Sequence, residues 1–286
     1  MEGFLETTDT LSSRQFHIAV KRLADSLSYG TDRSPFLGSG LEYVQSRPYQ
    51  WGDPIRSIDW RITGKTGRIH VKEYEAPKRL PCYLLIDTSA SMTVASTARS
   101  KYATALFIAG GLAFACLDRA SPVGVIGVGS REFHIEPSLS ADQVMQWLHR
   151  LRHYRFDETT AIATKLGDLA NRLPCRSLIM LLSDLHQPEA EPAIKLMAQR
   201  HDCIVLQLRD PAESGLPGIG FFRGQEAETG RLLTGHGRMK WLEHRNVAET
   251  LRRAGIDHLT IDIDRPYAHE LRYFLQARNV LSRGAR

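Results

Sequence analysis

The residues best suited to chemistry are one aspartate and two serines, spaced by two, in the stretch Asp87-Thr88-Ser89-Ala90-Ser91. The stretch follows the apolar run 82–86 and precedes a helical pattern, so it is expected at the carboxyl end of a strand, where α/β sheets bind ligands. One carboxylate and two hydroxyls can converge on a hard divalent cation such as Mg²⁺ or Mn²⁺. The alternative is a strand-to-helix turn in which these side chains act as cap residues.

Two other loops carry oxygen ligands at comparable places. The predicted strand 177–182 ends in Ser183-Asp184, and the loop before a predicted helix contains the run 157–160, Asp-Glu-Thr-Thr. Each has a structural alternative, because threonine caps helices and aspartate is common in turns. Their joint occurrence favours a metal site whose all-oxygen ligand set is Asp87, Ser89, Ser91, Thr160 and Asp184.

The elements that must position these residues alternate between strand and helix. Apolar runs predict strands over 82–86, 122–128, 177–182, 203–208 and 258–263, and helical patterns fall at 98–118, from 140, and at 161–172, 188–199, 239–254 and 268–278. The short alternating run 131–136 follows a two-residue Gly-Ser turn, which predicts an antiparallel edge strand. The fold class is therefore α/β, with a doubly wound, mostly parallel sheet.

The main domain is expected over residues 78–286, with an insertion near 210–237 that is rich in glycine and could form a hairpin of 220–223 with 231–234. Residues 1–77 form an N-terminal accessory segment, with a predicted helix over 12–28 and a half-exposed strand over 67–75. The boundary is placed near Pro77.

Within the accessory segment, residues 47–61 concentrate aromatic and charged side chains. This could be a ligand or partner surface, because arginine and aromatic residues are enriched in binding hot spots. It could instead be an Asp–Arg network that locks an irregular segment onto the main domain, with Ile55, Ile58 and Trp60 facing a core. The tight alternation favours this second interpretation. The candidate partner or scaffold residues are Arg47, Tyr49, Trp51, Asp53, Arg56, Asp59 and Trp60.

The composition is ordinary for a globular protein, with 42% hydrophobic and 24% charged residues. The net charge is +5, but the basic residues are scattered, so nucleic acid is not indicated as a partner. The four cysteines lack zinc spacing and fit free thiols in a reducing cytoplasm. The uncharged run 102–117 is shorter than the roughly 20 residues of a bilayer span, so no integral membrane segment is expected.

These motifs carry a resemblance to known proteins. Asp-x-Ser-x-Ser, a loop threonine and Ser-Asp at a strand end are similar to the metal-ion-dependent adhesion site (MIDAS) of von Willebrand factor type A domains. The run 47–60 ahead of that site resembles the bacterial family called domain of unknown function 58, whose pattern is roughly R-x-Y-x-x-G-D-x-x-R-x-I-D/H-W. The resemblance covers about residues 38–278.

The resemblance implies a metal-dependent protein-binding module that acts with a MoxR-type AAA+ ATPase in assembling or maturing other proteins, with the client unidentified. Ser89 and Ser91 would bind Mg²⁺ or Mn²⁺ directly, whereas Asp87 and Asp184 would act mostly through water. Thr160 would join when an acidic side chain of the partner completes the shell. The family often has Gly-Thr where this chain has Glu-Thr-Thr, so whether Thr159 or Thr160 matches stays open.

An enzyme is the alternative. Phosphoryl-transfer enzymes of the haloacid dehalogenase type also place an aspartate at the end of their first strand. They require a second aspartate two positions later as acid and base, and this chain has Ser89 there. No nucleophile elbow or dinucleotide fingerprint is present either. Non-enzymatic binding is therefore the favoured interpretation.

Overall fold

The computed structural model of this 286-residue chain describes residues 2–4, 18, 20–25, 42–53, 55–75, 80–118, 120–214, 221–225, 232–236 and 247–281. The chain divides into two compact units: unit 1 comprises residues 1–36 and 80–286, and unit 2 comprises residues 37–79. The predicted boundary near Pro77 lies close to the second junction. Residues 1–36, expected in the accessory segment, are grouped with unit 1.

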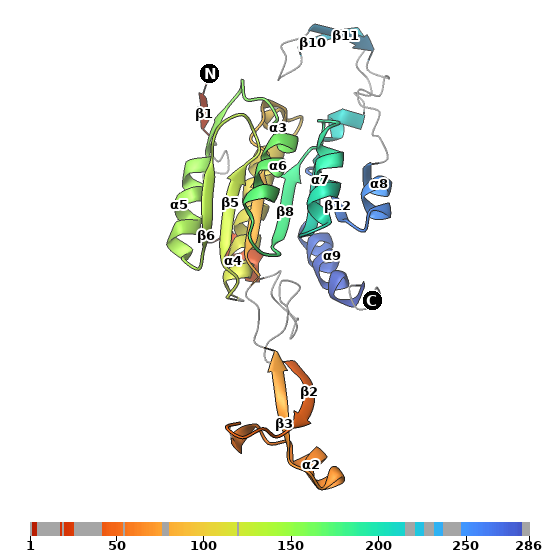
Figure 1. Ribbon diagram of the computed structural model, residues 1–286. Coiled ribbons are helices and arrows are strands. Elements are labelled where there is room, and N and C mark those ends of the chain that lie inside the picture. Colours follow the sequence, from red (N-terminus) through yellow and green to blue (C-terminus); the bar gives the residue numbers. More distant parts are fainter. Residues whose placement is uncertain are drawn as a thin grey trace. The chain divides into compact units, whose positions relative to one another are not determined.

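Unit 1 is built on a six-stranded sheet (Figure 1). In spatial order its strands are β12 (Asp257–Asp262), β9 (Asp202–Arg209), β8 (Leu178–Ser183), β4 (Cys82–Ile86), β5 (Val123–Gly127) and β6 (His134–Ser138). Neighbouring strands pair in parallel, except that β6 runs antiparallel to β5 at the edge. The predicted α/β class, with a mostly parallel sheet and one antiparallel edge strand, is confirmed.

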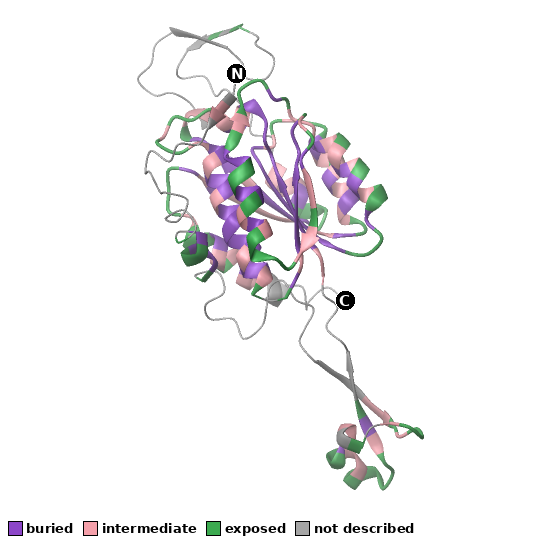
Figure 2. Ribbon diagram, turned by 90° about the vertical axis from the view of Figure 1, so that its left-hand side faces the viewer, coloured by how far each residue is buried: buried purple, intermediate pink, exposed green. Residues whose placement is uncertain are grey.

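Helices cover both faces of this sheet. They are α3 (Ala90–Thr93), α4 (Lys101–Leu117), α5 (Ala141–Leu151), α6 (Ile162–Arg172), α7 (Ala190–Ala198), α8 (Val247–Arg253) and α9 (Ala268–Leu281). Leu84 and Ile86 of β4 belong to the core that includes residues of α4, α5 and α9. Tyr83 and Leu85 belong to the other core, with α6, α7 and α8. Because β4 is central, it is apolar on both faces, and Figure 2 shows buried residues along the sheet.

The predicted strands of the sheet agree with the structure to within about three residues, because apolar runs of this length are distinctive. The predicted helix 98–118 is preceded by the separate short helix α3. Of the predicted helix 12–28, residues 18 and 20–25 are helical, and the other positions lie outside the described residues, as do 239–246. The pairing of β1 (Glu2–Phe4) with β7 (His153–Arg155) was not predicted, because three-residue strands show too little alternation.

Two short segments complete the description of unit 1. The 3₁₀ helix η2 (Pro211–Ser214) follows β9 directly. In the predicted insertion, β10 (Phe221–Gln225) pairs antiparallel with β11 (Leu232–His236), so the expected hairpin forms with a slightly shifted register. The remaining residues of 215–246 lie outside the described part of the chain.

Unit 2 contains the antiparallel strands β2 (Glu42–Pro48) and β3 (His70–Glu75), joined through η1 (Ile55–Ser57) and α2 (Trp60–Thr66). Strand β3 agrees with the predicted strand 67–75. Strand β2 and helix α2 were not predicted, since aromatic, charged and turn residues obscure the periodicity of this segment.

Candidate metal-binding site

The candidate site lies where β4 and β8 end side by side. Ile86 is paired with Leu182 in the parallel register, so the residues that follow each strand emerge at the same edge of the sheet. The amide of Asp87 donates to the carbonyl of Leu182 at 2.9 Å, which extends the pairing into the loop. This juxtaposition brings Asp87 next to Ser183 and Asp184, as the sequence predicted.

Asp87 is completely buried and firmly held. Its Oδ2 accepts a 2.6 Å hydrogen bond from the hydroxyl of Ser183, and its Oδ1 accepts from the amide of Ser89 at 3.1 Å. Burial, together with the charge of Asp184, raises the pKa of Asp87 to about 7 despite these bonds. A cation bound next to such a carboxylate would favour its charged form.

The two serine hydroxyls lie next to each other. Ser89 Oγ and Ser91 Oγ are 3.1 Å apart. Ser89 occupies the N-cap position of α3, but its hydroxyl makes no capping bond within the described part of the chain. Adjacent ligands of an octahedral Mg²⁺, each at about 2.1 Å, are separated by roughly 3 Å. The two hydroxyls, which form a hydrogen bond with each other, therefore have the separation of two adjacent ligands in such a shell.

Asp184 is also buried and lies beside the ammonium group of Lys101 and the imidazole of His186. Its Oδ2 lies 2.7 Å from Lys101 Nζ and 3.2 Å from His186 Nδ1. Burial raises the pKa of Asp184, but Lys101 and His186 outweigh it, so the net shift is downward. A hydrogen bond from Ser91 adds to this stabilisation. Asp184 is thus ionised and linked to the serine pair on one side and to Lys101 on the other.

Glu213 of η2 closes this charged cluster. Its Oε1 forms an ion pair with Lys101 Nζ and lies 3.7 Å from His186 Nε2. Burial opposes ionisation of all three groups. It is outweighed by their partners, which raise the pKa of Lys101 and of His186 and lower the pKa of Glu213. Asp184, His186 and Glu213 offer ligand atoms that all lie within 4.8 Å of one another.

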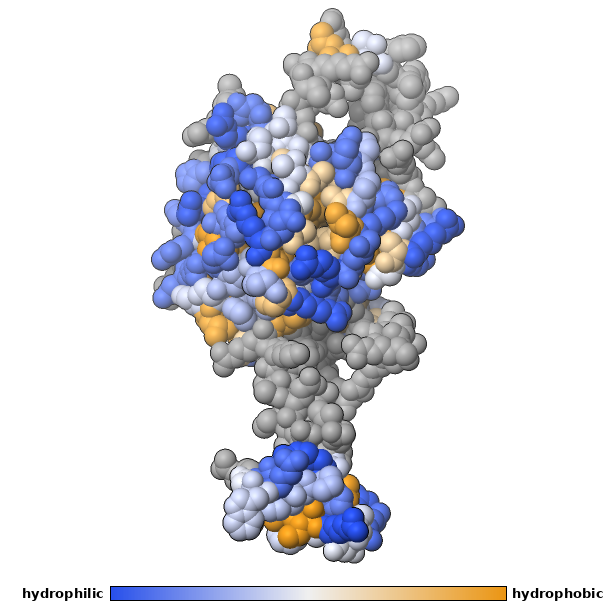
Figure 3. Space-filling model, in the orientation of Figure 1, coloured by the Kyte–Doolittle hydropathy of each residue, from blue (hydrophilic) through white to orange (hydrophobic). Residues whose placement is uncertain are grey.

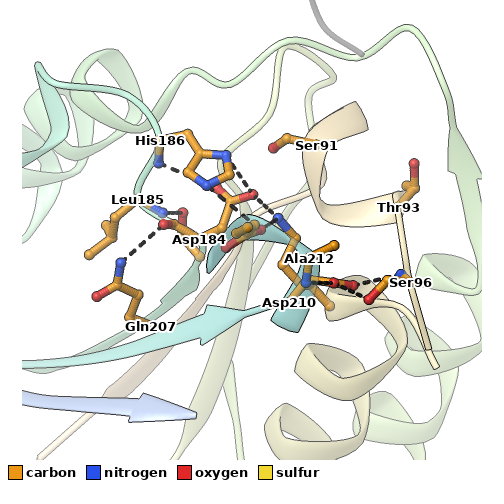
Figure 4. A network of polar contacts seen from close by, with 12 residues as sticks. Ser91, Thr93, Ser96, Asp184, Leu185, His186, Gln207, Asp210 and Ala212 are labelled. Atoms are coloured by element: carbon orange, nitrogen blue, oxygen red, sulfur yellow. Dashed lines mark hydrogen bonds and ion pairs between the residues drawn. The ribbon is translucent and has the colours of Figure 1, made fainter. Parts of the chain in front are cut away.

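The segment that carries Glu213 is tied to the loop after α3. Asp210 accepts hydrogen bonds from the amide of Ser96 at 2.8 Å and from its hydroxyl, and it also accepts from the amide of Ala212 at 2.9 Å. Figure 4 shows these contacts of Asp210 together with Asp184, His186 and Ser91. The loops after β4, β8 and β9 therefore form one connected polar network.

The threonine loop is anchored by Glu158, which is 2% exposed. Glu158 Oε1 accepts from Thr88 Oγ1 at 2.6 Å and from the amide of Arg131 at 3.1 Å, and the Glu158 carbonyl accepts from the amide of Ala90 at 2.7 Å. These bonds hold the loop against the Asp87–Ser91 stretch. Thr160, the more buried of the two threonines, forms a β-bridge with Gly129, whereas Thr159 is exposed.

The candidate residues of unit 2 include charged side chains paired within the unit and tryptophans that are exposed. Arg47 makes a bidentate ion pair with Asp53 at 2.8 Å, and buried Asp59 accepts from Ser46 Oγ and from the first amides of α2. Trp51 and Trp60 are 99% and 70% exposed. Tyr49 is half-buried, and the side chain of Arg56 lies outside the described residues.

The Asp–Arg network predicted for this segment therefore exists inside unit 2. The expectation that Ile55 and Trp60 face a core is wrong, because both are largely exposed, Ile55 at 73%. Unit 2 spans only residues 37–79, and so small a unit has too little interior to bury every apolar side chain.

Sequence reasoning missed Lys101, Glu158, His186 and Glu213 as parts of the site. Lys101 stands at the start of a helix, and Glu213 lies in a stretch interpreted as an insertion. His186 follows Asp184 by two residues, and that spacing is the one local signal that could have drawn attention to it.

Comparison with known sequences identifies the family. The family described as "Protein of unknown function DUF58" matches residues 45–257. The chain belongs to this family. Proteins similar to this chain include uncharacterized proteins of Mycobacterium tuberculosis (strain ATCC 25618 / H37Rv) and Mycobacterium bovis (strain ATCC BAA-935 / AF2122/97). Each is 25% identical over 282 residues, which covers 93% of this chain and 88% of the relative.

Among solved structures, the crystal structure of an uncharacterized membrane spanning protein from Vibrio fischeri is similar to this DUF58 chain. The match covers 70% of this chain and 96% of the other, with 16% identity and a TM-score of 0.23, which is too low to support a structural argument. Among the described helices of this chain, none combines the length and apolar character that crossing a bilayer requires.

Proposed function

We propose that this chain is a metal-dependent protein-binding module of the von Willebrand factor type A kind, with one Mg²⁺ or Mn²⁺ at the ends of β4 and β8. The observation that carries the proposal is the pair of serine hydroxyls 3.1 Å apart, beside two buried carboxylates. The mostly parallel sheet with an antiparallel edge strand supports the same assignment.

In this proposal each side chain has a defined task. Ser89 and Ser91 provide hydroxyl ligands. Thr160, on the loop that Glu158 anchors, becomes a further ligand when the partner binds. Asp87 and Asp184 supply negative charge near the metal without binding it directly, because their oxygens already accept hydrogen bonds or ion pairs from the protein. The bound cation supplies a positive centre that an acidic side chain of a partner can approach.

We further propose that the partner is a MoxR-type AAA+ ATPase in a bacterial cytoplasm, and that the pair assembles or matures other proteins in a chaperone-like role. The exposed Trp51 and Trp60 of unit 2 are proposed as contacts for this or another partner, since their supports, the Arg47–Asp53 ion pair and the Asp59 cap, hold them in defined positions. Figure 3 shows hydrophobic residues beside strongly hydrophilic ones on unit 2.

A binding role fits Asp87 better than a catalytic one. A nucleophilic carboxylate needs a free oxygen directed at its substrate, whereas both oxygens of Asp87 accept hydrogen bonds from Ser183 and Ser89. The alternative of phosphoryl transfer predicts hydrolysis of a generic aryl phosphate that the Asp87→Asn variant loses. The proposed function predicts no Asp87-dependent hydrolysis.

The metal claim is tested by titrating Mg²⁺ and Mn²⁺ calorimetrically into the protein and into the double variant Ser89→Ala with Ser91→Ala. The expected result is one binding event that the double variant loses. The matched control is Ser138→Ala with Ser140→Ala, which removes two hydroxyls at the same spacing, one at the end of β6 and one at the N-cap of α5. Equal binding by the protein and the Ser89/Ser91 variant would refute the proposal.

The partner claim is tested by affinity purification from the native host with Mg²⁺ or with a chelator. A MoxR-type ATPase should be retained with Mg²⁺ and lost with the chelator. The variant Trp51→Ala with Trp60→Ala should retain less, whereas Tyr273→Ala, at an exposed aromatic residue of α9, should not change retention. Failure to recover such an ATPase under either condition would count against this partner.

A further inference from the structure

Lys101 occupies an unusual place for a lysine. It is the first residue of α4 and is 2% exposed, and its ammonium group lies between two carboxylates. Nζ is 2.7 Å from Asp184 Oδ2 and is bonded to Glu213 Oε1. Lysine is almost never fully buried unless it is paired, so this position reflects the charges around it.

The groups around that ammonium resemble a set of metal ligands. Asp184, His186 and Glu213 offer two carboxylate oxygens and an imidazole nitrogen within 4.8 Å of one another, a combination that suits a divalent transition metal. Lys101 places a single positive charge among these atoms. Asp184 belongs both to this cluster and to the proposed metal site, through its hydrogen bond with Ser91.

We propose that Lys101 is a fixed cation in the position of a second metal ion and that, through Asp184, it sets the affinity of the neighbouring site for its divalent cation. This inference rests on the proposed function, because it assumes a cation near Asp87, Ser89 and Ser91. Lys101 acts on that cation in two ways. Its ammonium group repels the cation directly, and its ion pair with Asp184 offsets negative charge that would otherwise attract the cation.

Two substitutions should therefore change the affinity in opposite directions. Lys101→Met keeps the length of the side chain and removes the charge, so Asp184 and Glu213 are left without their buried cation and divalent-cation affinity should rise about tenfold or more. Glu213→Gln leaves Lys101 to pair with Asp184 alone, so affinity should fall by about threefold or more. A purely structural role would lower the affinity in both variants.

The experiment is calorimetric titration of Mg²⁺ and Mn²⁺ into the full-length protein and the two variants, with thermal unfolding followed with and without the metal. The matched control is Lys195→Met, which removes the lysine of a partly buried ion pair with Glu191 in α7 and should leave the affinity within about twofold. Lys101→Met should also unfold at a higher temperature when the metal is added, by a larger margin than the wild-type protein.

The outcomes separate this inference from the proposed function. If the wild-type protein binds the metal but neither variant shifts the affinity, or both lower it, the role of Lys101 is refuted and the metal site stands. If the wild type binds nothing and Lys101→Met binds, the proposed function fails for the native chain, whereas the effect of Lys101 on the affinity of the site is supported. If neither binds, both fail. If Lys101→Met does not fold, the Glu213→Gln variant alone decides. Weaker divalent-cation binding by this variant supports the inference, and unchanged or tighter binding overturns it.

Discussion

The hydroxyl of Ser183 donates a 2.6 Å hydrogen bond to Oδ2 of Asp87, and both side chains are completely buried. The bond joins the ends of β8 and β4, and Ser183 Oγ also accepts from the amide of Leu185 at 2.9 Å. Hydrogen bonds to charged groups contribute more to the stability of the folded protein than hydrogen bonds between neutral groups. This contact therefore orders the carboxylate around which the candidate site is built.

Replacing Ser183 with alanine should destabilise the protein by about 2 kcal/mol, since it removes a hydrogen bond to a buried carboxylate. The control is Ser177→Ala in the residue just before the same strand, where an equally buried hydroxyl donates to the carbonyl of Cys175. That neutral bond should cost about 1 kcal/mol. Urea unfolding at constant pH measures both, and an equal or smaller loss for Ser183→Ala would contradict the role given to this bond.

Gly129 stands where no side chain fits. A Cβ at this position would collide with Glu158 Oε1 and Thr88 Oγ1, the two atoms that anchor the threonine loop. Gly129→Ala should therefore destabilise unit 1 by about 1–3 kcal/mol and displace the loop that carries Thr160. Thermal unfolding measures the first effect, and loss of divalent-cation affinity measures the second.

The control for Gly129 is Gly167→Ala in α6, where a Cβ would meet no atom within 4 Å. Alanine is the better helix former, so this variant should be more stable by about 0.5–1 kcal/mol. If the two variants behaved alike, the crowding between Gly129 and Glu158 would not be the cause.

In unit 2, Asp59 and Trp60 are neighbours in sequence with opposite structural roles. Asp59 is buried, caps α2 and accepts from Ser46, whereas Trp60 is 70% exposed. Asp59→Ala should loosen unit 2, seen as faster amide hydrogen exchange in α2 and β3 while the exchange of β4 and β8 stays unchanged. Trp60→Ala should leave the exchange of all four elements unchanged. Similar exchange in the two variants would show that the cap does not hold unit 2.

The sequence predicted those parts of the site that follow strands. Asp87 comes directly after one apolar run, with Ser89 and Ser91 in the loop that follows, and Asp184 belongs to the Ser-Asp pair after another run. Parallel neighbours must end at one edge of the sheet, so the proximity of these residues follows from local patterns. The same reasoning gave the α/β class and the antiparallel edge strand, because the turn at 129–130 restricts the connection.

Lys101 and Glu213 could not be predicted in this way. Lys101 contacts residues 83 and 112 positions away, and no local pattern encodes such separations. The exposure of Trp51 and Trp60 escaped prediction for a different reason. Periodicity assumes that each apolar residue faces an interior, and in unit 2 the interior is occupied partly by polar groups such as Asp59.

His258 of β12 offers a test of the sheet edge through pH. Burial, and secondarily the charge of Arg252, lower the pKa of His258 to about 4, and its Nε2 lies 3.0 Å from Gln207 Oε1 on the adjacent strand β9. In the unfolded chain this histidine titrates near 6.5. Between these two pH values the unfolded chain binds a proton that the native protein does not, so stability is complete above about pH 6.5 and is lost as the pH falls toward 4.

The loss should be about 2 kcal/mol after allowance for the solvent that reaches this side chain. His258→Gln cannot titrate, so urea unfolding at pH 7 and pH 4.5 should show a smaller decrease for this variant than for the wild type. Parallel decreases would mean that His258 is protonated in the native sheet.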